Sequence, residues 1–312
     1  MGDEWASLFG YLFPPADSSG GREGAGDRYA DSATPLDSES KDEDIHRLRV
    51  QMQSLHLGRQ HSMPRYLEDT YLFQIASYIV SVEPSDNRSK GEFKIILTET
   101  IFHPQGGGQP SDVGWIQLDE DTQFEVLFVQ RNGSLIEHLG NFSRRNAPLE
   151  QYSNCPVTLH VDSRRRMESA KLHSAGHLID AAMERCGLGE TMKPSKGYHF
   201  PDGPYVEYNC VVEVPLPTTF LEDLNAALQT MMNEDIPTDV RVMNKESARS
   251  VVGDDLTSYP DQVRIVTVAG LPCPCGGTHT RTTSELKGLI VTKIRRKQNL
   301  IRVSYSLHSS KT

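Results

Sequence analysis

The sequence predicts an α+β protein, with a small antiparallel β domain at its N-terminal side and an α+β domain after it. Short strand-like segments separated by Gly, Asn and Asp fill residues 64–153, which is typical of antiparallel sheets. Two long helical patterns and several further strand-like segments fill residues 154–312. No run approaches the roughly 18 apolar residues of a membrane span, which excludes an integral membrane protein built from helices.

The N-terminal residues 1–63 are predicted to be a disordered acidic tail. Residues 1–45 hold 11 acidic and 3 basic side chains, so they carry most of the net charge of -10. Their Gly, Ser, Pro and Asp content offers too little apolar surface to offset the entropy of ordering the chain. Residues 46–63 fit a short helix as well as more tail. The remainder of the chain is nearly neutral, which leaves a polyanionic partner open.

The first predicted domain, residues 64–153, is built from strands. Residues 73–82 alternate β-forming side chains, and further strand-like segments follow at 93–97, 124–129 and 134–139. The second domain, residues 154–312, opens with a strand at 157–161. Asp162 and Ser163 are suitable N-caps for a helix of about 23 residues that stops at Gly187 or Gly189.

The rest of the second domain contains one more helical pattern and several strands. Apolar residues at helical spacing over 220–232 predict a helix that ends before Pro237. Strands are predicted at 206–214, 240–242, 263–268, 289–294 and 300–305. Helices and strands are not in strict alternation, so an α+β sheet is favoured over a doubly wound one.

Four side chains in the second domain are candidate metal ligands. His173 and His177 are four residues apart, which places both imidazoles on one helix face within reach of one ion. Cys275 and His279 flank a Gly-Gly turn about a hundred residues later. Three imidazoles and one thiolate suit Zn²⁺. Each pair alone is also common without a metal, and Cys273 is a rival thiol.

The pattern is not that of a zinc protease. In those enzymes a glutamate directly follows the first histidine and serves as general base. In this chain that position is Ser174. The residues therefore leave the water-activating group unassigned.

Two further motifs are candidates for contacts with a ligand. The backbone of Gly106, Gly107 and Gly108, which precede Gln109, is open to close approach by phosphate or ribose, although a plain turn between strands fits equally well. Arg164, Arg165 and Arg166 form a basic cluster at the start of the long helix, and a second basic cluster lies near the C-terminus. Solvated surface charge or a nucleic-acid contact explains both clusters.

The motifs in this order closely resemble the AlaX proteins, which are free-standing relatives of the alanyl-tRNA synthetase editing domain. The resemblance covers roughly residues 64–307 and is to the medium-length form. It rests on Tyr66–Leu72, the segment from Pro104 to Asp112 that contains three consecutive glycines, the His173–His177 pair, the segment Lys196–Phe200 and the Cys275–His279 pair.

The resemblance implies a cytoplasmic hydrolase that deacylates mischarged tRNA-Ala in trans. Its expected substrate is Ser-tRNA-Ala, with Gly-tRNA-Ala as a second candidate, because a pocket for alanine rejects these amino acids poorly. It implies one Zn²⁺ per chain on His173, His177, Cys275 and His279. By motif position, the Gly106–Gly108 backbone and Gln109 are expected to line the substrate pocket, and Lys196 and His199 to meet ribose or phosphate.

Two other functions remain open. The first is a zinc-stabilised tRNA-binding module without hydrolytic activity, because a structural zinc would keep the same four ligands. The second is an editing enzyme for another mischarged tRNA, such as Ser-tRNA-Thr, since threonyl-tRNA synthetase editing domains share both ligand pairs. No oligomeric state is predicted, and no membrane partner is expected.

Overall fold

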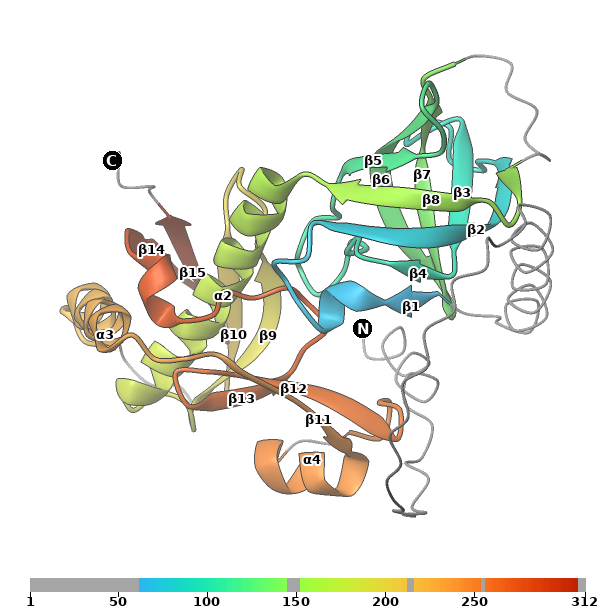
Figure 1. The fold of residues 1–312 in the computed structure, drawn as a ribbon. Coiled ribbons are helices and arrows are strands. Elements are labelled where there is room, and N and C mark those ends of the chain that lie inside the picture. Colours follow the sequence, from blue (N-terminus) through green and yellow to red (C-terminus); the bar gives the residue numbers. More distant parts are fainter. Residues whose placement is uncertain (1–61, 145–151, 212–215, 254–255, 308–312) are drawn as a thin grey trace, which may run out of the picture.

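The computed structural model describes residues 62–144, 152–211, 216–253 and 256–307 (Figure 1). The predicted tail over residues 1–63 therefore lies outside the described part except for its last two residues. Those belong to the start of the fold, because strand β1 (Met63–Pro64) pairs in parallel with β4 (Glu99–Thr100).

The N-terminal part is a closed barrel of six strands in the order β2-β3-β7-β6-β5-β8, and every neighbouring pair is antiparallel. Alternate residues such as Ile79, Phe124 and Val126 are buried inside it, as the period of two in a strand requires. The strands are β2 (Gln74–Pro84), β3 (Phe93–Leu97), β5 (Gly114–Gln117), β6 (Gln123–Asn132), β7 (Leu135–Phe142) and β8 (Pro156–Val161).

The barrel includes two strands that the sequence did not assign to it. The short strand β5 was not predicted, because four residues that begin with glycine carry little alternating pattern. Strand β8 was predicted as a strand but placed after the boundary at residue 153. The structure pairs β8 with β2 on one side and β5 on the other, so β8 closes the barrel. Pairing partners depend on contacts distant in sequence, which periodicity does not contain.

The C-terminal part contains two antiparallel sheets. One has the order β14-β15-β10-β9 and the other the order β11-β12-β13. Within the described residues three α-helices accompany them, as expected for the predicted α+β class. The elements are α2 (Ser163–Arg185), β9 (Met192–Tyr198), β10 (Tyr205–Cys210), α3 (Phe220–Glu234), β11 (Asp239–Asn244), α4 (Lys245–Val252), β12 (Gln262–Val268), β13 (Leu271–Pro274), β14 (Leu289–Lys297) and β15 (Leu300–Leu307).

Helix α2 begins and ends where the sequence predicts. The side chain of Asp162 accepts a hydrogen bond from the backbone N–H of Arg165, which caps the first turn. The chain leaves the helix at Cys186 and Gly187, the latter with φ of 76°. Helix α4 and strands β9 and β13 were not predicted; β9 is polar and contains Pro194, so it shows no alternating pattern.

Helices α2 and α3 cover the inner face of the four-stranded sheet. Leu178, Leu224 and Val303 are among the buried residues of this core. In Figure 1, α2 follows directly from β8 and runs alongside β9 and β10 of the four-stranded sheet. No helix in the described part of the chain is long and apolar enough to cross a membrane.

Candidate metal centre

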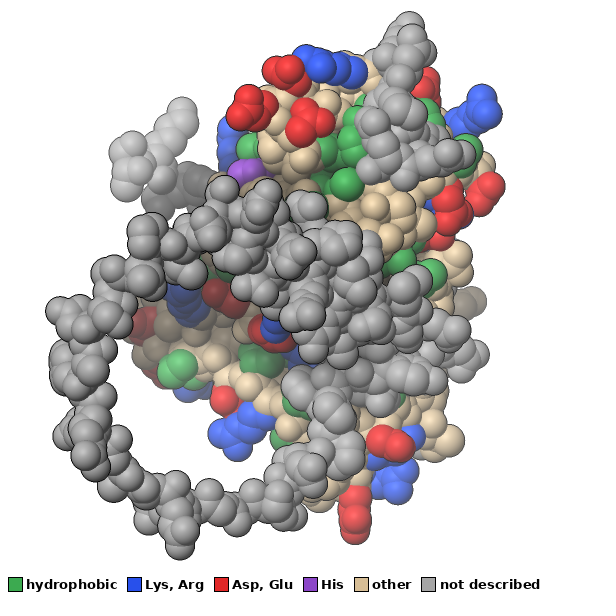
Figure 2. All heavy atoms as spheres, turned by 45° about the vertical axis from the view of Figure 1, so that its right-hand side comes forward, with side chains coloured by type: hydrophobic (Ala, Val, Ile, Leu, Met, Phe, Trp, Pro, Cys, Tyr) green, Lys and Arg blue, Asp and Glu red, His purple; other side chains and the backbone are tan. Residues whose placement is uncertain are grey.

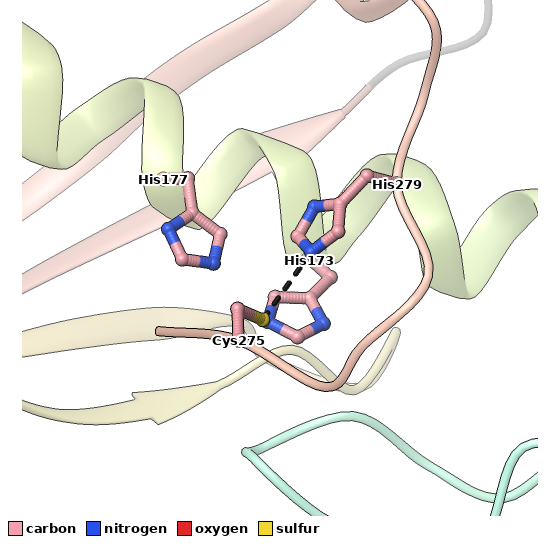
Figure 3. Close-up of side chains that lie close together, drawn as sticks. All are labelled: His173, His177, Cys275 and His279. Atoms are coloured by element: carbon pink, nitrogen blue, oxygen red, sulfur yellow. Dashed lines mark hydrogen bonds between the residues drawn. The ribbon is translucent and has the colours of Figure 1, made fainter. Parts of the chain in front are cut away.

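Four side chains from two distant segments meet beside helix α2 (Figure 3). His173 and His177 extend from α2, whereas Cys275 and His279 extend from the loop that follows β13. One ligand atom of each residue lies within 4.8 Å of those of the other three. The structure thus brings together the four residues that the sequence singled out.

The spacing within the cluster fits a tetrahedral metal site. The Sγ of Cys275 lies 3.5 Å from His173 Nε2 and 3.3 Å from His279 Nε2. Zn–N and Zn–S bonds of about 2.0–2.3 Å place tetrahedral ligand atoms about 3.3–3.8 Å apart. The donor types therefore fit Zn²⁺, and the two separations from the Cys275 sulfur lie within this range.

Gln109 fixes the orientation of His173. Its Oε1 accepts a hydrogen bond from the backbone N–H of Thr278 at 3.1 Å, and its Nε2 donates to Thr278 Oγ1 at 2.8 Å, so the amide orientation is determined. The same Oε1 lies 2.7 Å from His173 Nδ1, which therefore carries the proton and donates. The Nε2 of His173 is left free to bind a metal, as is typical of metal-ligating histidines.

Ser174 plays the corresponding part for His279. Its Oγ accepts from the backbone N–H of Thr280 at 3.0 Å and lies 3.2 Å from His279 Nδ1. With the proton on Nδ1, the Nε2 of His279 faces the Cys275 sulfur. The residue that takes the place of the protease glutamate is thus a buried hydrogen-bonding partner of a ligand.

A buried arginine holds the backbone of the ligand loop. Arg264 on β12 donates to the carbonyl oxygens of Cys275 at 2.6 Å and Gly277 at 3.2 Å. Gly277 leaves space for the ring of His173, because a Cβ there would lie 2.1 Å from that ring. The conformation of the ligand loop therefore depends on the absence of a side chain at Gly277 and on the hydrogen bonds from Arg264 in the adjacent sheet.

Burial determines the protonation of the four side chains. It lowers the pKa of His173 and His279 well below the usual range and the pKa of His177 to about 4, so these imidazoles are neutral near pH 7. Burial raises the pKa of the Cys275 thiol, and the Arg264 charge acts in the opposite direction. Neutral imidazoles are the form that binds metal, and a bound cation favours the thiolate.

A cavity of about 250 Å³ opens beside the cluster, and three of the predicted pocket residues line it. His173, His177 and Cys275 form part of its wall. So do Gly107 of the glycine-rich loop and Lys196 and His199 of the segment around β9. The remaining lining residues are Gly176, Asp180, Pro194, Ser195, Gly197, Val206, Tyr259, Arg264, Cys273, Pro274 and Gly276.

The glycine-rich loop reaches this cavity through its backbone. Gly106 and Gln109 form a tight turn through mutual backbone hydrogen bonds. Gly108, with φ of 78°, accepts a hydrogen bond from the N–H of His199, and a Cβ on Gly108 would lie 2.4 Å from the Gly197 oxygen. The loop is thus a turn between strands, and it is also packed against the β9 segment.

His199 is buried behind the ligands. Its Nδ1 lies 2.7 Å from the hydroxyl of Tyr305, and its ring stacks on His173 with centroids 4.7 Å apart. Gly176 and Gly197 leave space for this ring. His199 thus packs against a candidate ligand and is buried, whereas Lys196 is exposed.

The three consecutive arginines occupy different environments, and none lines the cavity. Arg166 is buried, ion-pairs with Asp112 and donates to the carbonyl oxygens of Thr70 and Ile101, so it lies in the interior instead of on a tRNA-facing surface. Successive helix positions point about 100° apart, which separates neighbours that the sequence groups together. Arg164 and Arg165 are exposed and line two separate surface hollows.

The second basic cluster lies on the outer face of the four-stranded sheet. Strand register places Arg302 opposite Arg295 and beside Tyr205, with its guanidinium 4.0 Å from the Tyr205 ring. Tyr205 also stacks on Tyr198 at 5.3 Å. The basic residues of this face are Lys193, Lys196, Lys293, Arg295, Lys297 and Arg302, and its acidic residue Glu207 pairs with Arg302. We refer to these six basic side chains with Tyr198 and Tyr205 as the outer sheet face.

The charge pattern differs on the side of the molecule seen in Figure 2. There, acidic and basic side chains are interspersed over the visible described surface. Interspersed charge keeps local potentials small, whereas residues of one sign gathered on a sheet attract a polyanion.

Several residues of the site were not identified from the sequence. Ser174, Asp180, Arg264 and Tyr208 lie in or directly around the cluster and cavity. Asp180 follows His177 by three residues, so its helical spacing was the one available signal. Cys273, the rival thiol, lines the cavity but is not part of the four-residue cluster.

The fold and site define a candidate metalloprotein with a cavity beside its ligands, and the known proteins that it resembles include alanyl-tRNA editing proteins and alanine–tRNA ligases. It is 27% identical to AlaX-L of Pyrococcus horikoshii over 249 aligned residues. The alignment covers 77% of this chain and 57% of AlaX-L. It is 25% identical to AlaX-M of Methanosarcina acetivorans, over 74% of this chain and 93% of the relative. It is 29% identical to Aarsd1 of Rattus norvegicus, over 70% of this chain and 52% of the relative.

These similarities confirm the resemblance that the motifs predicted. The chain is similar to several AlaX-type alanyl-tRNA editing proteins, at 24–27% identity over about three quarters of its length. It spans a little over half the length of AlaX-L and Aarsd1. No family model matches the chain.

Proposed function

We propose that this protein is a zinc-dependent aminoacyl-tRNA deacylase that hydrolyses mischarged tRNA-Ala, with Ser-tRNA-Ala as its main substrate and Gly-tRNA-Ala as a second one. The observation that carries the proposal is the convergence of His173, His177, Cys275 and His279 at the wall of a cavity. The relatives named alanyl-tRNA editing proteins support the same activity.

Under this proposal His173, His177, Cys275 and His279 hold one Zn²⁺. When bound, the ion supplies polarisation of the ester carbonyl or activation of water. Gln109 keeps the imidazole tautomer that leaves Nε2 of His173 available, and Ser174 holds the ring of His279 at Nδ1 while its Nε2 faces the Cys275 sulfur. Arg264 holds the ligand loop at its carbonyl groups.

The cavity and the outer sheet face support an RNA substrate with a small acyl group. At about 250 Å³ the cavity is below the roughly 300–1,000 Å³ typical of drug-sized ligands, which suits a small amino acid. Strand β9 contributes Lys196 both to the cavity wall and to the outer sheet face. The single-stranded end of a tRNA would thus meet basic and aromatic side chains on its way to the cavity.

The test is a deacylation assay combined with metal analysis. We expect turnover of Ser-tRNA-Ala and little turnover of Ala-tRNA-Ala, with about one zinc per chain. His173→Ala should remove both the metal and the activity, whereas His160→Ala on the barrel should keep both. Full activity in a metal-free His173→Ala protein would refute the assignment.

The same assay separates the other functions. A protein that binds zinc and tRNA without turnover would be a binding module. Preferential turnover of Ser-tRNA-Thr over Ser-tRNA-Ala would assign the enzyme to another tRNA.

A further inference from the structure

Asp180 is a third chemically active side chain on the cavity face of helix α2. Positions 173, 177 and 180 are separated by four and three residues, so they lie on one face of the helix. Asp180 is about 4.5 Å farther along the helix axis than His177, at 1.5 Å per residue. All three residues line the same cavity. A carboxyl group therefore lies next to the candidate metal ligands, within the space that a substrate would occupy.

The surroundings of Asp180 leave its carboxylate without a compensating cation. The hydroxyl of Tyr208 donates to Oδ1 at 2.6 Å. Within the described residues no lysine, arginine or histidine forms an ion pair with it. Shielding from water raises the pKa of Asp180 to about 7. A buried carboxylate of this kind is costly unless a cation pairs with it.

We propose that the carboxylate of Asp180 binds the α-ammonium group of the aminoacyl ester. The ammonium group is on the carbon next to the ester carbonyl, so when that carbonyl lies at the metal ligands the cation lies within a few ångströms of them. The only obligatory cation of an aminoacyl ester is this group, and a serine hydroxyl would leave the carboxylate charge uncompensated. Asp180 would thus recognise what every aminoacyl-tRNA shares, and Tyr208 would hold the carboxylate in position.

This inference rests on the proposed deacylase function, and the experiment tests both separately. Two substrates are compared on the same tRNA-Ala: the seryl ester and the glyceroyl ester, an ester of glyceric acid in which a hydroxyl group replaces the α-amine of serine. Asp180→Asn keeps the shape and the oxygen that accepts from Tyr208 but removes the charge. We expect kcat/KM for the seryl ester to fall about 10- to 100-fold, the effect of losing a charged hydrogen bond. The kcat/KM for the glyceroyl ester should change less than about twofold.

The controls separate recognition from chemistry and from misfolding. Glu184→Gln removes a carboxylate from an exposed position of the same helix and should leave both substrates unaffected. Zinc content of Asp180→Asn should match the wild type, and its thermal unfolding temperature should be no lower, because the substitution removes an uncompensated charge. Tyr208→Phe retains the charge and should retain the preference for the seryl ester, with a higher KM.

Three results would overturn the inference. An equal loss on both esters in Asp180→Asn would assign the carboxylate to water activation or to structure. An unchanged seryl rate would show that the ammonium group is bound elsewhere. A wild-type protein that hydrolyses neither ester would refute the deacylase function itself, and the inference would fall with it.

Discussion

At the scale of single residues, hydrogen bonds determine which atoms of the cluster are available. His173 carries its proton on Nδ1 because Gln109 Oε1 accepts it, and Nδ1 of His279 lies 3.2 Å from the Ser174 hydroxyl. Histidine ligands whose second nitrogen is held in this way bind metal more tightly, since less freedom is lost on binding. Residues around the ligands therefore affect affinity without touching the ion.

Replacement of Gln109 by alanine should weaken zinc binding about 10- to 100-fold, the usual effect of losing such a partner. A competition titration with a chromogenic chelator measures this affinity. Gln105→Ala is the matched control, because Gln105 is an exposed glutamine in the same loop. Equal zinc affinities for the two variants would contradict the orienting role of Gln109.

Another buried histidine, His138 in the barrel, should make stability depend on pH. Its Nδ1 donates to the Ile95 carbonyl oxygen, its Nε2 lies 2.7 Å from Thr100 Oγ1, and burial lowers its pKa to about 4. The unfolded chain binds this proton as the pH falls through about 6.5, but the folded chain binds it only near pH 4. Stability should therefore decrease as the pH falls from about 6.5 to about 4.

Urea unfolding between pH 8 and pH 4 tests this dependence. His138→Gln should be less stable than the wild type at pH 8, because it loses buried hydrogen bonds. Its stability should decline less steeply between pH 6.5 and 4, since one titrating group has been removed. A decline as steep as in the wild type would show that other groups cause the acid sensitivity.

At the scale of elements, the register of four strands creates the outer sheet face. Side chains two apart along a strand point to the same side, so Arg302 and Tyr205 share a face that helices α2 and α3 do not cover. In the sequence these residues are almost a hundred positions apart. Only strand pairing turns them into one basic and aromatic surface.

Reversing two charges of this face with Lys293→Glu and Arg295→Glu should weaken tRNA binding and reduce its dependence on salt. Each lost phosphate contact lowers the slope of log affinity against log salt by about 0.7–0.9. Filter binding at several salt concentrations measures the slope. The matched control reverses Arg88 and Lys90, two exposed basic residues in the barrel part. If the control weakens binding as much as the test variant, the RNA lies elsewhere.

At the scale of the whole molecule, a buried ion pair joins the barrel to helix α2. Arg166 pairs with Asp112, which also accepts from the backbone N–H of His103 in the loop that carries Gln109. The four candidate ligands thus belong to the C-terminal part, whereas the Gln109 amide that orients His173 belongs to the barrel part. The two parts should consequently unfold together.

Arg166→Met should destabilise the protein by about 3–5 kcal/mol, because the Asp112 carboxylate would stay buried without its partner. Chemical denaturation measures the change, and zinc affinity should fall as well, since Gln109 lies in the attached loop. Adding Asp112→Leu to Arg166→Met should recover part of the stability. Arg185→Met is the control: its pair with Glu234 is exposed and is worth about 1 kcal/mol or less. A similar effect of both substitutions would contradict the role of the buried pair.

The sequence by itself determined the long helix, most strands and the four clustered residues. These depend on local signals: the Asp162 cap, the alternation of β6, and the four-residue spacing of His173 and His177. Each of these is a property of a few consecutive residues, so periodicity and capping preferences contain it.

Only the tertiary structure decided which segments meet. The place of β8 in the barrel, the burial of Arg166 and the opening of Asp180 into the cavity depend on pairing and packing between residues far apart in sequence. The same holds for Gln109, which reaches His173 across 64 positions. The physical reason is that burial and hydrogen-bond geometry are properties of the packed chain, whereas a sequence pattern describes one element at a time.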